Sequence, residues 1–447
     1  MIEAGAIAAA VRRGERSARE VAIQALDAIE AAEPAMCAVT RVLRDRALAE
    51  AAAVDAAVAD GRDPGPLAGV PYGVKDLFDV ADLPTTAGSA IYADAPPATR
   101  DAEAVRRMRA AGAVLVATLN MDEFAYGFAT INARHGTTRN PRDPERLAGG
   151  SSGGSAAVVA AGALPLALGS DTNGSVRVPA SLTGTYGLKP THGALPMAGV
   201  FPFAASFDDV GPFAATARDM ALVWEVLSER RCRDDDASLR LARLGGRFRE
   251  NADPDQIAAI DALAGDTPIF EMSDITRARS AAFLMTAYEG GALHRAALAE
   301  QAMAFDPAVR DRLIAGALLP RALYAEACAF REAFHAAIDA QIANYDVLLA
   351  PATPCVAPRI DEPWILIDGL RVPARADLGI HTQPISFAGL PSLAVPLRRR
   401  TGALPIGLQL IGRRGGEAAL LRAAARWEAQ GLIGGTAPAP AIERAWA

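Results

Sequence analysis

Residues 149–177 read GGSSGGSAAVVAAGALPLALGSDTNGSVR, and this stretch decides how the chain is interpreted. Two loops rich in glycine and serine, 149–155 and 169–177, flank an apolar run. Residues 164–168 of that run fit a buried strand, so the second loop would begin at a strand end. Ser175 would then lie at a strand-to-helix turn, at the sheet edge where open α/β sheets bind their ligands.

Outside this stretch, helical and strand patterns alternate as they do in α/β proteins. Ser17 and Glu20 have the spacing of a capping box and open a predicted helix over residues 17–32. A second helix is predicted over residues 103–111, ending at Gly112. Further strands are predicted at residues 70–74, 113–117, 347–350, 392–396 and 406–411.

The length and composition favour one large domain. At 51% hydrophobic residues, the 447-residue chain can bury a large core. No internal repeat is visible that would indicate a solenoid or an array. We therefore predict a single domain over residues 1–447. Between about residues 230 and 342 the pattern is mainly helical, and we interpret this part as a lid or covering region over the sheet.

Charge and hydropathy exclude several classes of function. The 45 basic and 52 acidic side chains give a net charge of −7, so no basic face is available for nucleic acid. The longest run near the two loops that is free of charge and strong polarity, residues 155–169, is shorter than the roughly 18 residues of a membrane-spanning helix. No secretory signal is visible either. We expect a cytoplasmic protein with no nucleic-acid or membrane partner.

The cysteines argue against a metal centre. Cys37, Cys232, Cys328 and Cys355 are scattered and form no CxxC pair. This spacing predicts buried thiols in a reducing compartment rather than disulfides or zinc ligands. We therefore expect no metal site and no cofactor.

Three other interpretations of the Gly/Ser loops compete with a catalytic one. A phosphate-binding loop is disfavoured, because GxxxxGK[ST] is absent and no lysine lies beside either loop. A nucleophile elbow, GxSxG, matches twice, around Ser151 and Ser152, but an elbow needs a strand directly before it. Residues 139–148 contain two prolines and are not predicted as a strand. The third interpretation is a pair of turns without chemistry, and Lys75 argues against it.

Lys75 is one of two lysines among the 45 basic residues, the rest being arginines. It lies in the segment 69–79, GVPYGVKDLFD, where a strand-like run would carry it to the sheet edge. Burial lowers the pKa of a lysine, so a buried lysine can accept a proton, whereas arginine cannot. None of the five histidines lies in a motif that marks a catalytic base. The other lysine, Lys189, precedes Pro190 and is predicted to fix a loop.

The two loops and Lys75 together resemble the amidase signature family, which comprises serine hydrolases with a Ser-cisSer-Lys triad. The resemblance also includes Leu67–Pro71, Asn120–Phe124 and Leu404–Gln409, and so extends through most of the chain. It implies an α/β fold with a large mixed central sheet that is covered by helices on both faces.

The resemblance also implies roles for individual residues. Ser175 would be the nucleophile, Ser151 the relay serine on a cis peptide, and Lys75 the base that takes a proton through Ser151. The backbone N–H groups of Thr172, Asn173, Gly174 and Ser175 would hold the oxyanion. Ser152, Asp171 and Arg177 are interpreted as supports that fix the loops.

Three segments, Met121–Gly127, Asp171–Ser175 and Thr382–Ser386, resemble the 1-carboxybiuret hydrolase branch of the family, which cleaves a urea-derived intermediate of s-triazine breakdown. This likeness implies a small linear amide or urea-derived substrate, an acyl-enzyme, and release of ammonia or an amine. From their motif positions, Tyr126, His381 and Gln383 are candidate substrate contacts.

Alternatives to this function stay open. The chain could be the glutaminase (A) subunit of a tRNA-dependent amidotransferase, a broad-specificity aliphatic or aryl amidase, or a scaffold subunit without catalysis. Intact Lys75, Ser151 and Ser175 argue against the scaffold. The likeness implies either a homodimer or a complex with a small helical partner subunit. Two departures from the family pattern are Asn173, where glycine is common, and Thr183, where cysteine is frequent.

Overall fold

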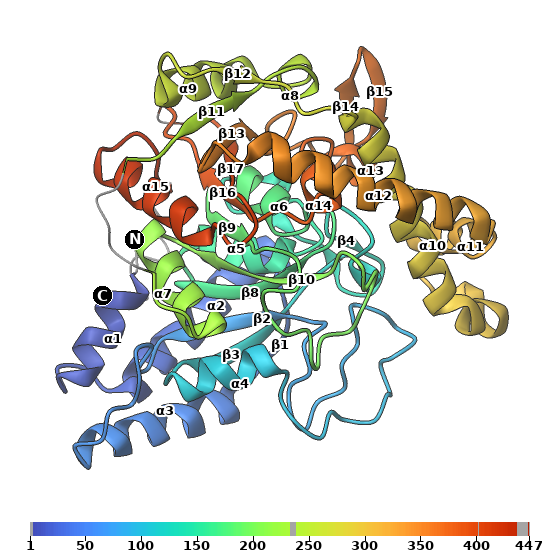
Figure 1. Cartoon of the computed structure of the whole chain (residues 1–447). Coiled ribbons are helices and arrows are strands. Elements are labelled where there is room, and N and C mark those ends of the chain that lie inside the picture. Colours follow the sequence, from blue (N-terminus) through green and yellow to red (C-terminus); the bar gives the residue numbers. More distant parts are fainter. Residues whose placement is uncertain (1–2, 233–237, 401, 436–445, 447) are drawn as a thin grey trace.

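The computed structural model describes residues 3–232, 238–400, 402–435 and 446. Within these residues, eleven strands form one mixed sheet that runs through the molecule (Figure 1). In their order across the sheet, the strands are β1 (Val39–Val42), β3 (Val114–Leu119), β2 (Pro71–Lys75), β8 (Leu166–Asp171), β10 (Asp209–Ala214), β9 (Tyr186–Lys189), β16 (Ser392–Pro396), β17 (Gly407–Ile411), β13 (Val347–Pro351), β11 (Leu241–Leu244) and β12 (Ile269–Phe270). The sheet confirms the predicted fold class.

Strands from both halves of the chain contribute to this sheet. β3, β2 and β8 run parallel, every pair from β8 across to β13 is antiparallel, and β13, β11 and β12 are parallel again. Because β16 pairs with both β9 and β17, the sheet has no break between the two halves of the chain. We therefore propose that the described residues form a single domain.

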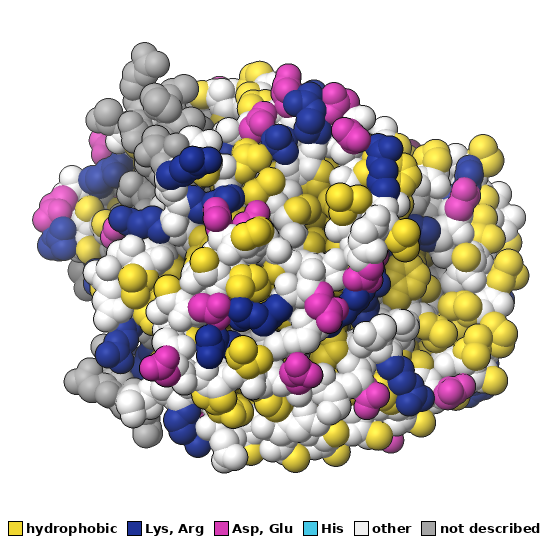
Figure 2. Space-filling view, turned by 90° about the horizontal axis from the view of Figure 1, so that it is seen from above, with side chains coloured by type: hydrophobic (Ala, Val, Ile, Leu, Met, Phe, Trp, Pro, Cys, Tyr) yellow, Lys and Arg dark blue, Asp and Glu magenta, His cyan; other side chains and the backbone are white. Residues whose placement is uncertain are grey.

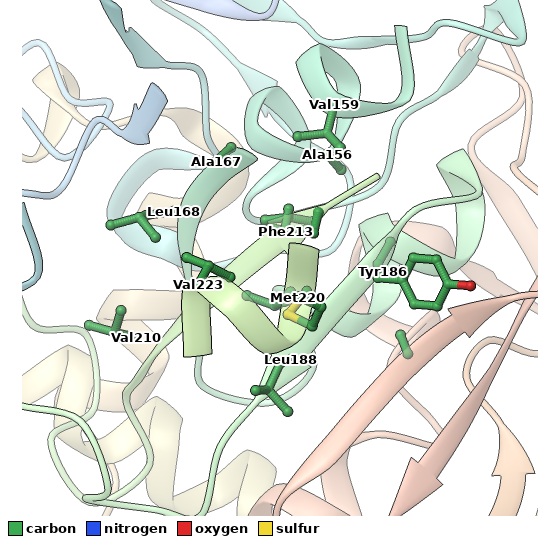
Figure 3. Close-up of a cluster of buried hydrophobic side chains, with 14 of the residues drawn as sticks. Ala156, Val159, Ala167, Leu168, Tyr186, Leu188, Val210, Phe213, Met220 and Val223 are labelled. Atoms are coloured by element: carbon green, nitrogen blue, oxygen red, sulfur yellow. The ribbon is translucent and has the colours of Figure 1, made fainter. Parts of the chain in front are cut away.

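Helices cover both faces of the sheet, as predicted. α2 (Ala18–Met36), α5 (Gly153–Ala161) and α6 (Arg177–Thr183) pack on one face, and α4 (Glu103–Ala110), α7 (Ala217–Ser228) and α15 (Glu417–Ala429) pack on the other. Figure 3 shows the core at the middle strands, with Val159 of α5 on one side and Met220 and Val223 of α7 on the other. Leu168 and Phe213, both fully buried, belong to the strands between these helices.

The start of α2 follows the predicted capping box. The Ser17 side chain accepts hydrogen bonds from the backbone N–H groups of Arg19 and Glu20, and the Glu20 side chain accepts one from the Ser17 N–H. These bonds satisfy N–H groups that have no partner within the first turn of a helix. The helix continues to Met36, past the predicted end at residue 32, because buried apolar positions recur through that residue.

The part of the chain from 230 to 342 is mainly helical, but it also contains strands that the sequence did not predict. Its helices are α8 (Arg247–Glu250), α9 (Pro254–Ala264), α10 (Ile275–Gln301), η2 (Ala302–Ala304), α11 (Pro307–Ala317) and α12 (Arg321–Ile342). β11 and β12 join the edge of the sheet beside β13. Both are short, and β11 contains an arginine, so neither stands out as an apolar run. Residues 233–237 of this region lie outside the described residues.

α10 and α11 pack against each other and project from the body of the protein (Figure 1). Seen from above, apolar side chains are frequent at this end of the molecule (Figure 2). Leu293, Met303 and Leu318 belong to this part of the chain and are 47%, 83% and 76% exposed. We call these three residues the apolar end of the helical projection.

The remaining elements lie outside the main sheet. They are α1 (Ala4–Arg12), α3 (Arg44–Ala59), η1 (Glu123–Ala125), the ribbon β4 (Ile131–Asn132) with β5 (Gly136–Thr137), the ribbon β6 (Arg139–Asn140) with β7 (Asp143–Leu147), the ribbon β14 (Trp364–Ile367) with β15 (Leu370–Pro373), α13 (Ala374–Asp377) and α14 (Gln383–Phe387). The strands β6 and β7 correct the prediction that residues 139–148 contain none. Their ribbon belongs to a separate two-stranded sheet, so it does not provide the strand of a nucleophile elbow.

In the described part of the chain, no single helix has the length and apolar character to cross a membrane, and the strongly bent pair α11 and α12 reaches that threshold only when taken together. No group of three metal-ligating side chains was found among the described residues.

Candidate active site

Lys75 is the last residue of β2, and its side chain is fully buried. Because β2 runs parallel to β8, with Val74 opposite Leu168, Lys75 lies at the same sheet edge as the loop that follows β8. Its Nζ donates hydrogen bonds to Ser151 Oγ at 2.7 Å and to Ser170 Oγ at 2.9 Å. The fold therefore brings the predicted base to the first Gly/Ser loop.

Burial lowers the pKa of Lys75 to about 7. Asp122, Asp208 and Asp171 oppose this shift by attracting the positive charge. In the residues that the structure describes, no carboxylate forms an ion pair with Lys75, and its polar contacts are hydroxyl groups. A substantial fraction of Lys75 is therefore neutral at pH 7 and able to accept a proton.

The loop that carries Ser151 is held by the segment after β3. The peptide bond between Gly150 and Ser151 is cis. The Ser151 carbonyl accepts hydrogen bonds from Asp122 N–H at 3.3 Å and from the Thr130 hydroxyl at 3.4 Å. A Cβ at Gly150 would lie 2.3 Å from Asp122 Oδ2, so this close approach requires glycine.

The loop that carries Ser175 is built around Asp171. The Asp171 carboxylate accepts hydrogen bonds from Gly174 N–H at 2.7 Å and Val176 N–H at 3.1 Å, and it pairs with Arg177 at 2.9 Å. Burial favours the protonated form of Asp171, but Arg177, Lys189 and the Val176 N–H together outweigh it and lower the pKa. Arg177 is fully buried and also donates to Ser386 Oγ at 2.6 Å. Asp171 and Arg177 are therefore placed where they can hold the loop that carries Ser175.

Ser152 joins the two loops. Its N–H donates to the Ser175 carbonyl at 3.1 Å, and its hydroxyl donates to the Ser170 carbonyl at 3.1 Å. Ser151 and Ser175 are thus carried by backbone segments that hydrogen-bond to each other. The structure brings Lys75 into hydrogen-bond contact with Ser151, and it places the Ser175 segment beside Ser152 at the same sheet edge.

The predicted oxyanion donors divide into two groups. In the described chain, the N–H groups of Thr172, Asn173 and Ser175 have no acceptor. The Gly174 N–H already donates to Asp171, so the prediction that it holds the oxyanion is corrected. Three backbone donors of this turn therefore stay available to a substrate oxygen.

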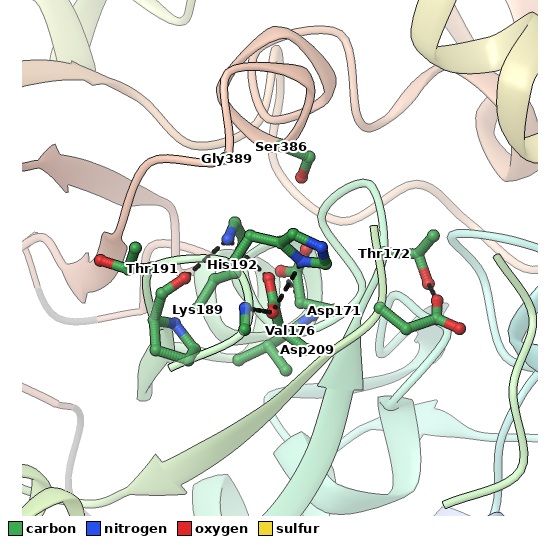
Figure 4. Close-up of polar contacts among 12 residues, drawn as sticks. Asp171, Thr172, Val176, Lys189, Thr191, His192, Asp209, Ser386 and Gly389 are labelled. Atoms are coloured by element: carbon green, nitrogen blue, oxygen red, sulfur yellow. Dashed lines mark hydrogen bonds and ion pairs between the residues drawn. The ribbon is translucent and has the colours of Figure 1, made fainter. Parts of the chain in front are cut away.

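The turn itself is fixed by its conformation and by one side chain. Gly174 has a φ of 135°, and a Cβ there would lie 2.1 Å from Thr382 Oγ1, so the turn requires glycine. The Thr172 hydroxyl donates to Asp208 at 2.6 Å (Figure 4). This hydrogen bond ties the turn to the residue that precedes β10.

A narrow cavity lies beside Ser175. It is lined by residues of η1 and the following turn, of the Ser175 loop, of the loop before β10, and of α10, α11 and α14, namely Ala125, Tyr126, Gly127, Phe128, Thr172, Asn173, Ser175, Phe203, Phe283, Thr286, Arg312 and Gln383. Its volume is about 20 Å³, which holds about one water molecule. Phe283 lines this cavity and is also 40% exposed. Two of the three predicted substrate contacts, Tyr126 and Gln383, are in its wall.

His381, the third predicted contact, does not line the cavity. It is buried, its ring lies near that of Phe248 at a centroid distance of 5.8 Å, and its Nε2 is 2.7 Å from the Asn251 carbonyl oxygen. Its backbone carbonyl accepts a hydrogen bond from Gln409 at 2.8 Å. Burial lowers the pKa of His381 to about 4, so the ring is neutral at pH 7. The structure therefore assigns this residue to packing, and its motif position misled the prediction.

Sequence reasoning also missed cavity residues, above all Arg312. Arg312 of α11 lies over the Tyr126 ring at 3.7 Å and donates to the Tyr126 carbonyl at 3.0 Å. Burial lowers its pKa, and among the described residues it has no carboxylate partner. Nothing in the local sequence separates Arg312 from the other arginines of the chain. Ser170, by contrast, stands inside the second Gly/Ser loop and could have been found there.

Comparisons with known proteins agree with this geometry. A family model described as Amidase matches residues 20–256 and 268–421. The chain is 44% identical over 434 residues to AtzE, a component of 1-carboxybiuret hydrolase from Pseudomonas sp. (strain ADP), covering 92% of this chain and 95% of that protein. It is 35% identical over 467 residues to the A component of glutamyl-tRNA(Gln) amidotransferase from Chloroflexus aurantiacus (strain ATCC 29366 / DSM 635 / J-10-fl), with 93% of each covered.

Solved structures give the same result. A structure concerned with a vestigial protein complex and the origins of an s-triazine catabolic enzyme matches with a TM-score of 0.93 at 43% identity, covering 98% of this chain and 100% of that one. The crystal structure of an amidase matches with a TM-score of 0.89 at 32% identity, covering 96% and 100%. The range matched by the family model includes both Gly/Ser loops and the strand that ends at Lys75. The chain therefore belongs to the amidase signature family and is an amide hydrolase.

Proposed function

We propose that this protein hydrolyses a small, linear, urea-derived amide of the carboxybiuret type through Lys75, Ser151 and Ser175. The observation that carries the proposal is the 2.7 Å contact between a fully buried Lys75 and Ser151, on the loop that hydrogen-bonds to the Ser175 segment. Similarity to the 1-carboxybiuret hydrolase component AtzE supports the substrate class.

The proposed reaction begins with proton transfer along the relay. Neutral Lys75 takes a proton from Ser151, and Ser151 takes one from Ser175, which attacks the scissile carbonyl. The free N–H groups of the Ser175 turn hold the negative oxygen, and losing one such donor typically costs about 3 kcal/mol. The proton then returns through Ser151 to the leaving nitrogen, which departs as ammonia or an amine. Water hydrolyses the acyl-enzyme by the same relay.

The side chains of the cavity wall favour a substrate that carries a carboxylate. Arg312 brings a positive charge into the wall, and no carboxylate of the described chain forms an ion pair with it, although Asp122 attracts it from a distance. A half-buried guanidinium that contacts no carboxylate favours a bound anion, since burial of an uncompensated charge is costly. Arg279 donates to Gln383 Oε1 at 2.9 Å, which leaves the NH₂ group of Gln383 available as a donor to substrate oxygen.

The test is a panel of small amides and ureas, with and without a carboxylate, in which released ammonia is measured. We expect turnover of carboxylate-bearing ureas and amides by the wild type and none above background by Ser175→Ala. An Arg312→Met variant should raise KM for the carboxylate-bearing substrates and leave neutral amides unaffected. Equal turnover by wild type and Ser175→Ala would refute the proposal.

A glutaminase role is the second candidate, because the chain is 35% identical to the corresponding amidotransferase component. Such a protein would release ammonia from glutamine only together with its partner subunits. Glutamine turnover by this chain that appears only when those partners are added would favour the second candidate over the first. Turnover of hydrophobic amides and anilides in the same panel would instead indicate a broad aliphatic or aryl amidase.

We also propose that the protein works as a homodimer or with a small helical partner subunit. One solved structure to which it is similar concerns a protein complex. The apolar end of the helical projection is exposed, and such surfaces often lie in interfaces. Light scattering on the purified chain distinguishes a dimer from a monomer, and purification from the native source under mild conditions would recover a bound companion.

A further inference from the structure

Asn173 lines the cavity, and its side-chain Oδ1 has no hydrogen-bond partner in the described chain. We propose that Asn173 determines specificity by accepting an N–H of the substrate's acyl part, so that the enzyme prefers ureido substrates, in which nitrogen adjoins the scissile carbonyl. A carboxamide, which has carbon at that position, lacks the donor. This inference rests on the proposed function and specifies its substrate class further.

Two of the four polar groups of Asn173 have partners within the protein. Its backbone carbonyl accepts a hydrogen bond from Thr382 Oγ1 at 2.7 Å, and its Nδ2 donates to Thr286 Oγ1 at 3.3 Å. In the described chain, its backbone N–H and its side-chain Oδ1 have none. Asn173 is 8% exposed and lines the cavity. An unsatisfied acceptor in a buried site is costly, and a substrate donor would remove that cost.

Thr286 determines which atom of the Asn173 side-chain amide has no hydrogen-bond partner. The Thr286 hydroxyl, on α10, donates its hydrogen to the Ala282 carbonyl at 2.9 Å. It can therefore only accept from Asn173, and the amide must present its NH₂ group to Thr286. This arrangement leaves Oδ1, not Nδ2, without a partner. Thr286 thus acts as a positioning residue, and the helical projection orients the specificity group.

The backbone N–H and the Oδ1 of Asn173 could together bind one part of a substrate. A free N–H and a free carbonyl oxygen on the same residue are complementary to a carbonyl with an adjacent N–H. The backbone N–H of Asn173 would contact the carbonyl oxygen, as an oxyanion donor, while Oδ1 accepts the adjacent N–H. One residue would thereby recognise both the reacting carbonyl and its neighbour.

The position of the cavity indicates on which side of the carbonyl this N–H lies. The leaving nitrogen has to receive its proton through Ser151, which is not part of the cavity wall. Asn173 and Arg312 share that wall and therefore face the part of the substrate that remains attached to Ser175. The recognised N–H consequently belongs to the acyl part, which makes the substrate a ureide.

A matched pair of probes tests this inference. Ureidoacetate and succinamate both carry a carboxylate and a terminal CONH₂ group, and they differ by one replacement of NH with CH₂. Ammonia release gives kcat/KM for each. Because urea and amide carbonyls differ in intrinsic reactivity, the informative quantity is how the ratio of the two values changes between variants.

Asn173→Ala should lower kcat/KM for ureidoacetate about 10- to 100-fold and for succinamate less than about threefold, since only the urea loses a hydrogen bond. Thr286→Val, which keeps the shape but lets the amide turn, should lower the ratio about 3- to 10-fold. Thr286→Ser keeps the hydroxyl and should retain the wild-type ratio. An equal loss on both probes would show a purely structural role for Asn173 and overturn the inference.

Binding to an inactive enzyme gives a second readout that does not depend on turnover. By calorimetry, Ser175→Ala should bind ureidoacetate at least about 10-fold more tightly than the Ser175→Ala/Asn173→Ala double variant does, with little change for succinamate. Equal affinities would overturn the inference even if amide hydrolysis is observed. Failure of the proposed function itself would appear separately, as an absence of ammonia release from every member of the substrate panel.

Discussion

Lys75 and Lys189 are the two lysines of the chain, and they occupy similar places in the same sheet. Lys75 ends β2 and Lys189 ends β9, and their exposed fractions are 0% and 1%. Their partners differ. Lys189 Nζ lies 2.8 Å from Asp209 Oδ2 in a buried ion pair (Figure 4), whereas Lys75 contacts two serine hydroxyls. The two lysines are therefore equally buried, but only Lys189 contacts a negative charge.

The contacts of the two side chains explain why Lys75, and not Lys189, is suited to act as a base. At Lys189, a carboxylate contacts the ammonium group, and the attraction of Lys189 and His192 lowers the pKa of Asp209 in spite of its burial. At Lys75, burial lowers the lysine pKa to about 7, because the nearest carboxylates act only from a distance. Desolvation without a contacting counter-charge leaves a neutral amine, which can serve in a proton relay.

The largest expected effect comes from Lys75→Arg. Arginine keeps the positive charge but does not lose its proton, so acylation of Ser175 should stop. We expect kcat/KM for ammonia release to fall about 1,000-fold or more. Lys189→Arg is the matched control, since that site needs only a charge, and it should retain most of the activity. Comparable losses in the two variants would contradict the distinction between the two lysines.

Asp209→Asn removes the negative charge that pairs with Lys189. An uncompensated buried charge is costly, and we expect a loss of about 3–5 kcal/mol in the free energy of unfolding, measured with urea. The double variant Lys189→Met/Asp209→Asn should recover part of that loss, because it leaves no charge unpaired. If the double variant is no more stable than Asp209→Asn, the stability argument for this ion pair is wrong.

Ser170→Asp should make the Lys75 site resemble the Lys189 site. A carboxylate in contact with Nζ favours the charged lysine and moves the half-point of the pH profile of kcat/KM from about 7 to about 9. Activity at pH 7 should then fall about 10- to 100-fold and recover as the pH rises. Ser170→Ala, with no charge, should keep its half-point near pH 7. An unchanged profile in Ser170→Asp would mean that Lys75 does not set it.

The smallest expected effect concerns the pH dependence of the free energy of unfolding, and it is seen by comparing the wild type with Lys75→Met. The pKa of Lys75 is lowered from 10.5 to about 7 in the folded protein, so between these pH values the unfolded chain binds more protons. The free energy of unfolding of the wild type should therefore rise with pH in this window, by on the order of 1–2 kcal/mol from pH 7 to 9, relative to Lys75→Met. Parallel pH dependences of the two proteins would contradict the lowered pKa.

Much of the fold could be predicted because its signals are local. Buried strands such as 392–396 stand out as apolar runs, and the Ser17 capping box marks a helix start. Lys75, Ser151 and Ser175 could be proposed as site residues because each stands in a contiguous motif. The order of strands could not be predicted from such runs, since β16 lies between β9 and β17 through long-range pairing.

The rest of the site depends on side-chain directions that motif positions do not give. His381 stands in a suggestive segment, yet its ring lies against Phe248 and away from the cavity. The Gly174 N–H was expected to donate to the oxyanion, but it donates its hydrogen bond to the Asp171 carboxylate. Arg312 reaches the cavity because α11 packs onto α10 and the Tyr126 turn, far along the chain from Ser175. Only tertiary packing identifies it.

The most direct test of the central claim is the pH dependence of Ser175 labelling by phenylmethylsulfonyl fluoride. If neutral Lys75 activates Ser175 through Ser151, the inactivation rate should rise with pH and reach half its maximum near pH 7. Mass spectrometry should locate the label on Ser175, and Lys75→Arg should not be labelled over the same pH range. A half-point near 10.5, or labelling of Lys75→Arg at the wild-type rate, would contradict the account.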